Sequence, residues 1–382
     1  MRKSLALLLV ACLCVFGCGF TVVDSAPITL SADAGILIDA GTGQVLCEKN
    51  ADELQNASGA IKVMSMLLVF DAIEDGRLSL TDSITVSSAA ASMGGTQAFL
   101  EANADYSAEE LVRAMCMASA NDATVALCEK LFGSQEIMVA KMNERAQMLG
   151  CTQTTFDNCT GLDTQGKTTA RDLARIAQAL TEKRNVFTYT SVYMYSLTHP
   201  TGRVTELANP NRLVRFYTNC DGFATGSSAT AKYAGVFTAK RSDLRLIAVV
   251  LGAQDSNKRF EDAKIMMDYG FATYTSRVVA RKGEILHKDA EVDGGQPKTV
   301  NIECAEDVRV TMERGEEKLL RKELELPLPL TAPVEKGQQV GTMHVYIGDR
   351  LILNVPVITS TDAKTLKLSD LWKLIIRCWV CG

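Results

Sequence analysis

The feature that most constrains the fold of this chain is an apolar run at Leu244–Leu251, in which Arg245 is the only charged residue. A nearly continuous apolar run of this length is typical of a strand that is buried on both faces. Strand structure is predicted for residues 234–251 as a whole, and residues 34–47 are predicted to form a hairpin around the turn Asp39–Gly43. These strands enclose a segment that is otherwise helical. We therefore expect an α+β domain with a largely antiparallel sheet and a helical cluster.

Helical periodicity fills the interval between the strands. After Lys62, apolar residues recur at the spacing of a helix until the stop signal Asp75-Gly76. Further amphipathic helices are predicted at residues 107–117, 121–132, 134–149, 170–183 and 258–273.

The character of the sequence changes after residue 274. Short alternating segments bounded by turns replace the helices, which predicts a small all-β domain of β-sandwich-like form. The expected strands are residues 276–284, 298–304, 307–313, 319–326, 340–346 and 350–357. We therefore divide the chain into a leader (1–26), an α+β domain (27–273), a β domain (274–358), and a polar linker followed by an amphipathic helix (359–382).

The first residues indicate export. Arg2 and Lys3 form a positive n-region, and the apolar stretch Leu5–Phe20 has the length of a signal-peptide core but is short for a membrane span. Two maturation routes fit the leader: cleavage near Ala26, or lipidation at Cys18 in a segment that resembles a lipoprotein box. Either route predicts an extracytoplasmic protein.

The tail indicates a membrane location. Apolar residues are interleaved with Lys367, Lys373 and Arg377, and both tryptophans of the chain, Trp372 and Trp379, lie here. A basic amphipathic helix with interfacial tryptophans is typical of a segment that lies on a membrane surface. We predict association with the outer face of the cytoplasmic membrane, and a helix packed on its own domain is the alternative.

Charge and cysteine usage narrow the possible partners. The net charge of -5 and the lack of a long basic run give no reason to expect nucleic acid. Outside the leader the cysteines are odd in number and irregular in spacing, which is not a disulfide framework, so most are expected to be small buried hydrophobes. Cys378-x-x-Cys381 has no second pair and the chain has only 3 histidines, so we predict no metal site and no cofactor.

A set of short motifs runs in order through residues 29–272. The motifs are Gly35–Asp39, Glu48–Glu53, Lys62–Ser65, Ala91–Gly95, Ala118–Ala123, Gly161–Asp163, Asn209–Leu213, Asp221–Phe223 and Thr238–Gly252. Together they resemble the serine-type D-alanyl-D-alanine carboxypeptidases, which are low-molecular-weight penicillin-binding proteins of the β-lactamase/transpeptidase-like fold. The β domain and the amphipathic tail match the usual appendages of this family.

The resemblance implies a specific chemistry. Members of the family hydrolyse the terminal D-Ala-D-Ala bond of peptidoglycan stem peptides through an acyl-enzyme, and penicillins trap the serine involved. The usual motifs are S-x-x-K at a helix start, then S-x-N and K-T-G. Serine and lysine one turn apart share a helix face, so the amine can take the hydroxyl proton. The S-x-N loop relays protons and holds the substrate amide, while the K-T-G strand pairs with the substrate and its lysine attracts the terminal carboxylate.

The chain departs from this pattern at two motifs. Counting without gaps from the segment Asn50–Asp52, the lysine of S-x-x-K is Lys62, but the nucleophile position holds Gly59. The lysine of K-T-G is replaced by Ala224. The site residues that the resemblance implies are, for catalysis, Lys62, Ser119 and Asn121 and, for substrate binding, Ala224, Thr225 and Gly226.

Two losses at separate motifs predict a catalytically defective homologue. A glycine has no group that can attack a carbonyl, and Ala224 removes a charge-assisted contact worth roughly 1.5–3 kcal/mol. We expect the chain to act at peptidoglycan as a binding or scaffold protein. Its expected partner is the stem peptide or another cell-wall enzyme.

Other interpretations stay open at this point. An active carboxypeptidase would use Ser58, which shares a helix face with Lys62 at a spacing of four residues, although we favour an N-cap or an exposed position for Ser58. Ser119 and Asn121 open a predicted helix, where capping alone accounts for them. Lys62 is either a buried amine with a lowered pKa or a side chain that reaches solvent. A third candidate function is a structural envelope protein with a collapsed pocket.

Overall fold

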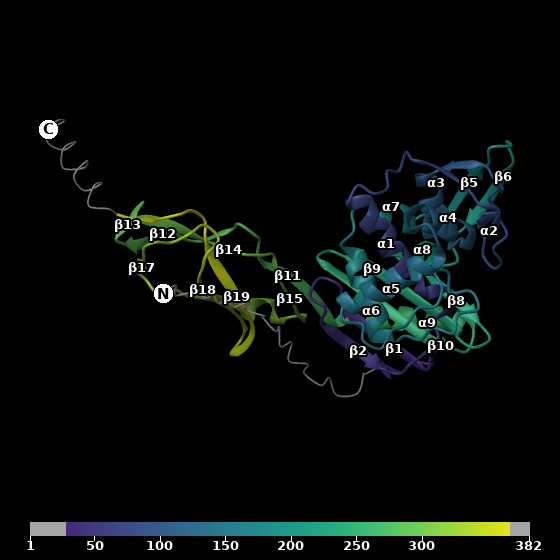
Figure 1. Cartoon of the computed structure of the whole chain (residues 1–382). Coiled ribbons are helices and arrows are strands. Elements are labelled where there is room, and N and C mark those ends of the chain that lie inside the picture. Colours follow the sequence, from purple (N-terminus) through teal and green to yellow (C-terminus); the bar gives the residue numbers. More distant parts are fainter. Residues whose placement is uncertain (1–27, 367–382) are drawn as a thin grey trace, which may run out of the picture.

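The structure, a computed structural model, describes residues 28–366. The predicted leader and the predicted amphipathic helix of the tail lie outside these residues. Figure 1 shows a rounded body of helices and strands, followed along the chain by an elongated body made of strands. Within residues 28–366 no helix has the length and apolar character that a membrane crossing needs.

An antiparallel sheet lies at the centre of the rounded body. Its strand order is β2-β1-β10-β9-β7, and β8 also pairs with β9. The hairpin predicted at residues 34–47 is confirmed, because β1 pairs with β2 on one side and with β10 on the other. The strands are β1 (Ala34–Asp39), β2 (Val45–Lys49), β7 (Cys220–Gly222), β8 (Thr225–Ser228), β9 (Lys232–Arg241) and β10 (Leu244–Ala253).

Strand β10 is the buried central strand that the apolar run predicts. Leu246 and Val250 pack in one hydrophobic cluster, whereas Ile247 and Val249 pack in another. Neighbouring residues of a strand point to opposite faces, so both faces of β10 are covered. The helix α6 contributes to one cluster and the helix α9 to the other.

Helices cover both faces of this sheet, and all five amphipathic helices predicted after the first occur to within two residues at each end. Helix α1 is buried along most of its length and apolar on most sides, which suits a helix enclosed by others. The helices are α1 (Lys62–Glu74), α2 (Ser88–Ala91), α3 (Ala108–Ala118), α4 (Asn121–Phe132), α5 (Gln135–Met148), α6 (Ala170–Thr181), α7 (Val186–Thr190), α8 (Leu213–Phe216) and α9 (Ser256–Thr273).

Two small hairpins lie outside the central sheet. One pairs β3 (Ser83–Thr85) with β4 (Asp105–Ser107), and the other pairs β5 (Met194–Thr198) with β6 (Val204–Ala208). Figure 1 places β5 and β6 near α3, at the end of the rounded body that lies away from the elongated one.

The elongated body is all-β, as the sequence predicts. Its largest sheet has the order β16-β18-β19-β14-β12-β17. The strands are β11 (Tyr274–Ala280), β12 (Ile285–Asp293), β13 (Gly295–Gln296), β14 (Thr299–Cys304), β15 (Val308–Glu313), β16 (Leu320–Glu325), β17 (Leu330–Thr331), β18 (Gln339–Ile347), β19 (Arg350–Thr359) and β20 (Lys364–Thr365).

The two-residue strands β13, β17 and β20 were not predicted, and two larger details of this body also differ from the sequence predictions. Strand β12 was not predicted, because its pairing with β14 is interrupted by two register shifts and its burial does not alternate cleanly. The segment from Thr359 to Lys364, predicted as a linker, instead packs on the β domain. Ala363 is fully buried and exchanges backbone hydrogen bonds with Val334.

The two bodies meet at the turn after β1. Thr42 Oγ1 lies 2.8 Å from Thr311 Oγ1 on β15, and the Thr311 hydroxyl also donates to Asp39. Asp39 is fully buried and also accepts from the Gly41 backbone N–H at 2.9 Å. The β1–β2 turn therefore joins the two bodies through hydrogen bonds to a buried carboxylate.

Candidate active site

A hollow of about 490 Å³ lies where the start of α1, the junction of α3 and α4, and the strand β8 converge. All the site residues that the sequence predicts line this hollow, with the exception of Ala224. They come from stretches of chain that are far apart in the sequence. The fold therefore brings the predicted motifs together in one place, which we take as the candidate site.

Lys62 is the first residue of α1 and is buried. Its Nζ donates a hydrogen bond to Thr160 O at 2.8 Å. Burial disfavours the charged ammonium and lowers the pKa of Lys62 to about 8, against a smaller opposing influence of Cys159. Of the two states predicted for Lys62, the structure shows the buried one.

Gly59 lies in the 3₁₀ turn Ser58–Ile61 that leads into α1. A Cβ built on Gly59 would lie 3.4 Å from Lys62 Nζ and 3.1 Å from Thr225 O. A side chain at this position would therefore project between the amine and β8, where a nucleophile activated by that amine has to be. This geometry favours the register that assigns the nucleophile position to Gly59.

Ser58 differs from its prediction, because it neither caps the helix nor is exposed. The N-cap of the turn is Ala57, without a side-chain cap, and Ser58 is buried with a left-handed φ of 45°. Its Oγ lies 3.2 Å from Ser227 O and 3.4 Å from Gly161 O. The hydroxyl has one proton, and either of these carbonyl oxygens can accept it. The left-handed backbone turns this hydroxyl toward two carbonyl groups, whereas the Lys62 amine donates to Thr160 O.

The side chains of Ser119 and Asn121 also do not cap the start of α4, so the interpretation that they open a helix as capping residues is wrong. Ser119 ends α3 in a left-handed conformation, and the N-cap of α4 is Ala120, which makes no side-chain cap bond. Asn121 Nδ2 donates to Gly94 O at 2.8 Å, while its buried Oδ1 has no hydrogen-bond partner within the described residues. A buried acceptor without a donor is costly. Because Asn121 lines the hollow, a ligand N–H could supply the missing donor.

The Ala224-Thr225-Gly226 motif leads into β8. Its Thr225 and Gly226 pair with β9 in antiparallel register and line the hollow. Ala224 is 2 % exposed and packs in the hydrophobic core instead.

Gly226 is where β8 and the turn before α1 come closest. A Cβ on Gly226 would lie 2.4 Å from Gly59 N and 2.7 Å from Ala60 N, which are backbone atoms. We expect Gly226→Ala to lower the free energy of unfolding by about 1–3 kcal/mol, measured by urea denaturation. The control is Gly94→Ala, whose Cβ would meet Leu162 Cδ2 at 3.6 Å, an ordinary contact. Equal stability of the two variants would contradict this close approach.

Two arginines that were not predicted as site residues, Arg212 and Arg259, also line the hollow. Arg259 of α9 is buried, and its Nη1 donates to Gly226 O and to Ala234 O, each at 3.1 Å. Burial lowers the pKa of Arg259 to about 10, and the nearby charge of Arg212 contributes in the same direction. The site therefore has two guanidinium groups, although the position predicted for the lysine of K-T-G holds Ala224.

Only one of these two arginines could have been predicted from the sequence. Arg212 belongs to the motif Asn209–Leu213, and its place in that motif indicates a position at the site. Arg259 lies in an amphipathic helix among other charged residues, where an arginine at the surface is the ordinary expectation. Only the packing of α9 against β9 places it at the site.

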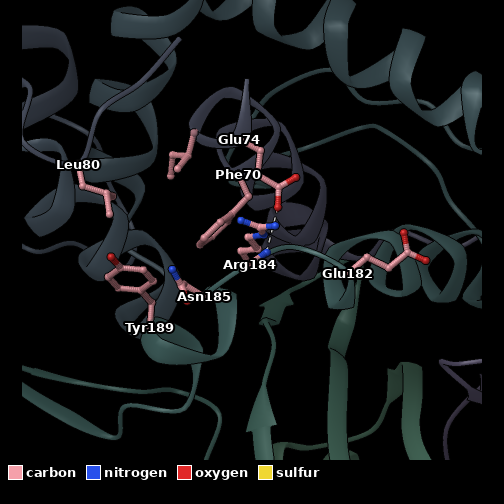
Figure 2. A pocket seen from close by; sticks show the side chains of 8 residues that line it. Phe70, Glu74, Leu80, Glu182, Arg184, Asn185 and Tyr189 are labelled. Atoms are coloured by element: carbon pink, nitrogen blue, oxygen red, sulfur yellow. Dashed lines mark hydrogen bonds between the residues drawn. The ribbon is translucent and has the colours of Figure 1, made fainter. Parts of the chain in front are cut away.

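A larger hollow, of about 700 Å³, lies near the other end of α1 and against α7 (Figure 2). None of the predicted site residues line it. Of its two acidic residues, Glu74 and Glu182, Glu74 already accepts from Lys183 Nζ at 2.9 Å and from the Arg184 backbone N–H at 3.0 Å. Size alone does not identify the functional site, and the smaller hollow has the relevant groups.

The smaller hollow offers hydrogen-bonding groups and positive charge. An unsatisfied amide oxygen, a strand edge and two guanidinium groups can hold a peptide that ends in a carboxylate. With glycine at position 59, the Lys62 amine has no neighbouring hydroxyl on that residue to deprotonate. In the part of the chain that the structure describes, no cluster of three or more His, Cys, Asp or Glu side chains could bind a metal ion.

Comparison with known protein families gives two matches. Residues 21–255 match the family described as D-alanyl-D-alanine carboxypeptidase, and residues 274–365 match the family described as penicillin-binding protein 5, C-terminal domain. The order of the two matches follows the order of the two bodies in the fold.

Individual relatives span almost the whole chain. The D-alanyl-D-alanine carboxypeptidase DacF of Bacillus subtilis is 33% identical over 350 residues, covering 91% of this chain and 90% of the relative. DacC of Escherichia coli is 34% identical over 354 residues, covering 88% of this chain and 85% of the relative. Among solved structures, penicillin-binding protein 5 of Haemophilus influenzae superposes with a TM-score of 0.79 at 27% identity, covering 89% of this chain and 100% of that one.

Proposed function

This chain belongs to the D-alanyl-D-alanine carboxypeptidase family, and we propose that it binds the D-Ala-D-Ala end of peptidoglycan stem peptides without cleaving it. The observation that carries the proposal is the geometry at Gly59. The position whose side chain would meet the Lys62 amine has no side chain, although a Cβ there would lie 3.4 Å from Nζ. An acyl-enzyme needs an oxygen or sulfur nucleophile, and residue 59 supplies neither.

The magnitude of the expected loss supports a binding role. Serine proteases that lose a member of the catalytic triad keep only about 10³–10⁴-fold acceleration over water, from the oxyanion hole and binding. A remnant of that size on amide hydrolysis has no physiological value. The chain would then act on the cell wall by holding stem peptides or by recruiting other cell-wall enzymes.

The remaining groups of the hollow support binding of a peptide. Asn121 Oδ1 is a buried acceptor that a ligand amide N–H can satisfy. The strand β8 can pair with an extended peptide, as strand edges do in other peptide-binding proteins. Arg212 and Arg259 line the same hollow, and guanidinium groups recognise carboxylates. These groups argue against a collapsed pocket.

The main competing function is an active carboxypeptidase that uses Ser58. Such a mechanism needs the Ser58 hydroxyl to give its proton to Lys62. The Ser58 Oγ instead lies within hydrogen-bonding distance of Ser227 O and Gly161 O, and the Lys62 amine donates to Thr160 O. We therefore favour the binding function.

Location is part of the proposal. The family acts on an extracytoplasmic substrate, so we propose that the chain is exported and works at the outer face of the cytoplasmic membrane. The residues that would direct export and hold the membrane surface, 1–26 and 359–382, lie largely outside the described residues. We also propose that the α+β domain ends at residue 273 and that the β domain begins at residue 274.

Fluorescent penicillin tests the loss of catalysis directly. We expect no covalent band for the purified protein on a denaturing gel, because an acyl bond requires a nucleophile. DacF of Bacillus subtilis, the relative named above, is the positive control. A band that disappears in Ser58→Ala would overturn the binding proposal in favour of the active carboxypeptidase.

Calorimetry tests the binding half. A pentapeptide that ends in D-Ala-D-Ala should bind with measurable heat, and a peptide that ends in L-Ala-L-Ala should not. Asn121→Ala should weaken the D-Ala-D-Ala complex about tenfold, which is the loss expected when a hydrogen bond of about 1.4 kcal/mol is removed. Lack of any binding by a folded wild-type protein would favour the structural envelope protein instead.

A further inference from the structure

Two buried thiols meet behind the candidate site. Cys128 lies on α4, and Cys159 lies in the loop that precedes the hollow. Cys128 Sγ lies 3.5 Å from Ser134 O, and Cys159 Sγ lies 3.7 Å from Gln135 Oε1, so both sulfurs reach the N-terminus of α5. The ionisation of each thiol also affects the pKa of the other. Both cysteines are fully buried and carry no bond between them in this structure.

The segment that contains Cys159 is tied to the start of α1. The carbonyl oxygens of three consecutive residues, 159, 160 and 161, face side-chain donors from residues 58–65. Ser65 Oγ donates to the first at 2.6 Å and Lys62 Nζ to the second at 2.8 Å, while Ser58 Oγ lies 3.4 Å from the third. We call residues 159–161 the strap. The strap fixes where the Lys62 amine points.

Helix α4 forms another wall of the hollow. It begins at Asn121, whose side chain lines the hollow, and it contains Cys128 two turns further along. A covalent link from Cys128 to Cys159 would therefore join α4 to the strap, and with it the S-x-N side of the site to the S-x-x-K side.

We propose that Cys128 and Cys159 form a disulfide when the chain folds outside the cytoplasm, and that this bond fastens the strap to α4. Disulfides form and persist in exported proteins, where no reducing system keeps thiols free. The proposal does not rest on peptide binding or on the loss of catalysis. It requires only that the two sulfurs meet during folding under oxidising conditions.

Either thiol can begin the reaction, because in the unfolded chain neither sulfur is buried. The thiolate is the nucleophile in thiol–disulfide exchange, so the first attack comes from whichever of the two thiols has lost its proton.

The oxidant in this step is a small-molecule disulfide such as oxidised glutathione. In one of the two possible orders, the Cys159 thiolate attacks one sulfur of glutathione disulfide, forming a mixed disulfide and releasing one glutathione thiolate. Cys128 then loses its proton and attacks the Cys159 sulfur, which releases the second glutathione. The protein loses two electrons and two protons, and one glutathione disulfide becomes two glutathione thiols. Because both thiols are buried in the native fold, the exchange belongs to folding.

Refolding of the full chain tests the proposal. The protein is unfolded in urea with reductant, then refolded in a buffer rich in oxidised glutathione, and its remaining thiols are blocked before digestion. Peptide mapping by mass spectrometry without reductant should show one cross-linked pair that contains Cys128 and Cys159, lighter by two hydrogens than the separate peptides. The midpoint of thermal unfolding should rise by about 5–10 °C relative to the reduced protein, the shift expected for a loop of this size.

Variants separate this bond from other effects of oxidation. Cys128→Ser should abolish both the cross-linked peptide and the rise in midpoint. The matched control is Cys116→Ser, since Cys116 is equally buried on the neighbouring helix α3 and should keep both. Free thiols at 128 and 159 in the refolded wild-type protein, or a cross-link between other cysteines, would overturn the proposal. The wild-type map decides the question even if a serine variant does not fold.

Discussion

The double variant Gly59→Ser with Ala224→Lys is expected to form a covalent adduct with fluorescent penicillin, whereas the wild-type chain forms none. The residues predicted to act with a serine at position 59 lie around that position: a Cβ on residue 59 would lie 3.4 Å from Lys62 Nζ, and Ser119 and Asn121 line the same hollow. Removal of the serine nucleophile costs about 10⁶-fold in the protease subtilisin. Its return should therefore take acylation from undetectable to complete within the assay.

The two single variants show how much of the penicillin labelling comes from the new serine and how much from the new lysine. Gly59→Ser alone should label slowly, because a nucleophile is present but the ammonium that attracts the ligand carboxylate is not. Ala224→Lys alone should not label. Ala224 is buried in the core, so circular dichroism and thermal unfolding must first show that each variant folds. A double variant that folds and stays unlabelled would mean that Gly59 does not occupy the nucleophile position.

The second large effect concerns the pH dependence of stability. Lys62→Met is expected to stabilise the chain at pH 7 by about 1–3 kcal/mol. The folded state of the wild type must hold a buried ammonium whose pKa is lowered to about 8, and this lowering corresponds to at most about 3 kcal/mol. Methionine has a similar length and no charge, although it leaves Thr160 O without the lysine donor.

The sign of the pH dependence follows from the lowered pKa. Below about pH 8 both folded and unfolded chains hold the Lys62 proton, so the full cost of the buried charge is present. Between pH 8 and the ordinary pKa of lysine, near 10.4, only the unfolded chain holds it. Wild-type stability should therefore gain a contribution from Lys62 as pH rises through this window, and the advantage of Lys62→Met should shrink.

Urea unfolding of both proteins at several values between pH 6.5 and pH 10.5 measures this difference. Other titrating groups are common to the two proteins and cancel in the comparison. Lys167→Met is a matched control, because Lys167 is exposed. A constant difference between wild type and Lys62→Met across the window would show that the amine is not desolvated.

Much of the fold could be predicted because strong periodic patterns decide it. The apolar run at Leu244–Leu251 requires burial on both faces of the strand, and α6 and α9 pack against the two faces. Helices with clear amphipathic patterns were located to within two residues. Strand β12 was missed because its pairing is irregular, and a period-2 pattern fades where bulges interrupt the ladder.

For the candidate site, the sequence predicted several of the residues that meet in the hollow, but it did not predict their backbone conformations or hydrogen bonds. Motif order identified Lys62, Ser119 and Asn121, which the fold brings to one hollow. The sequence suggested caps at Ser58 and at the S-x-N segment, because serine and asparagine near a helix start usually cap it. Ser58 and Ser119 instead have left-handed backbone conformations, and neither side chain caps a helix start. The sequence also did not predict the partners of Arg259 or the Cys128–Cys159 pair, which are set only by packing.

The glycine between Lys62 and β8 also has a pharmacological consequence. A β-lactam acts on a serine-containing relative through a bond that persists after the free drug is gone. Under the binding function proposed above, a pocket with Gly59 at that point would bind such a drug only reversibly, so its occupancy would fall when the drug is washed out. During antibiotic exposure this chain would keep access to D-Ala-D-Ala ends while acylated relatives lose it. Surveys that find antibiotic targets by covalent labelling would not detect it.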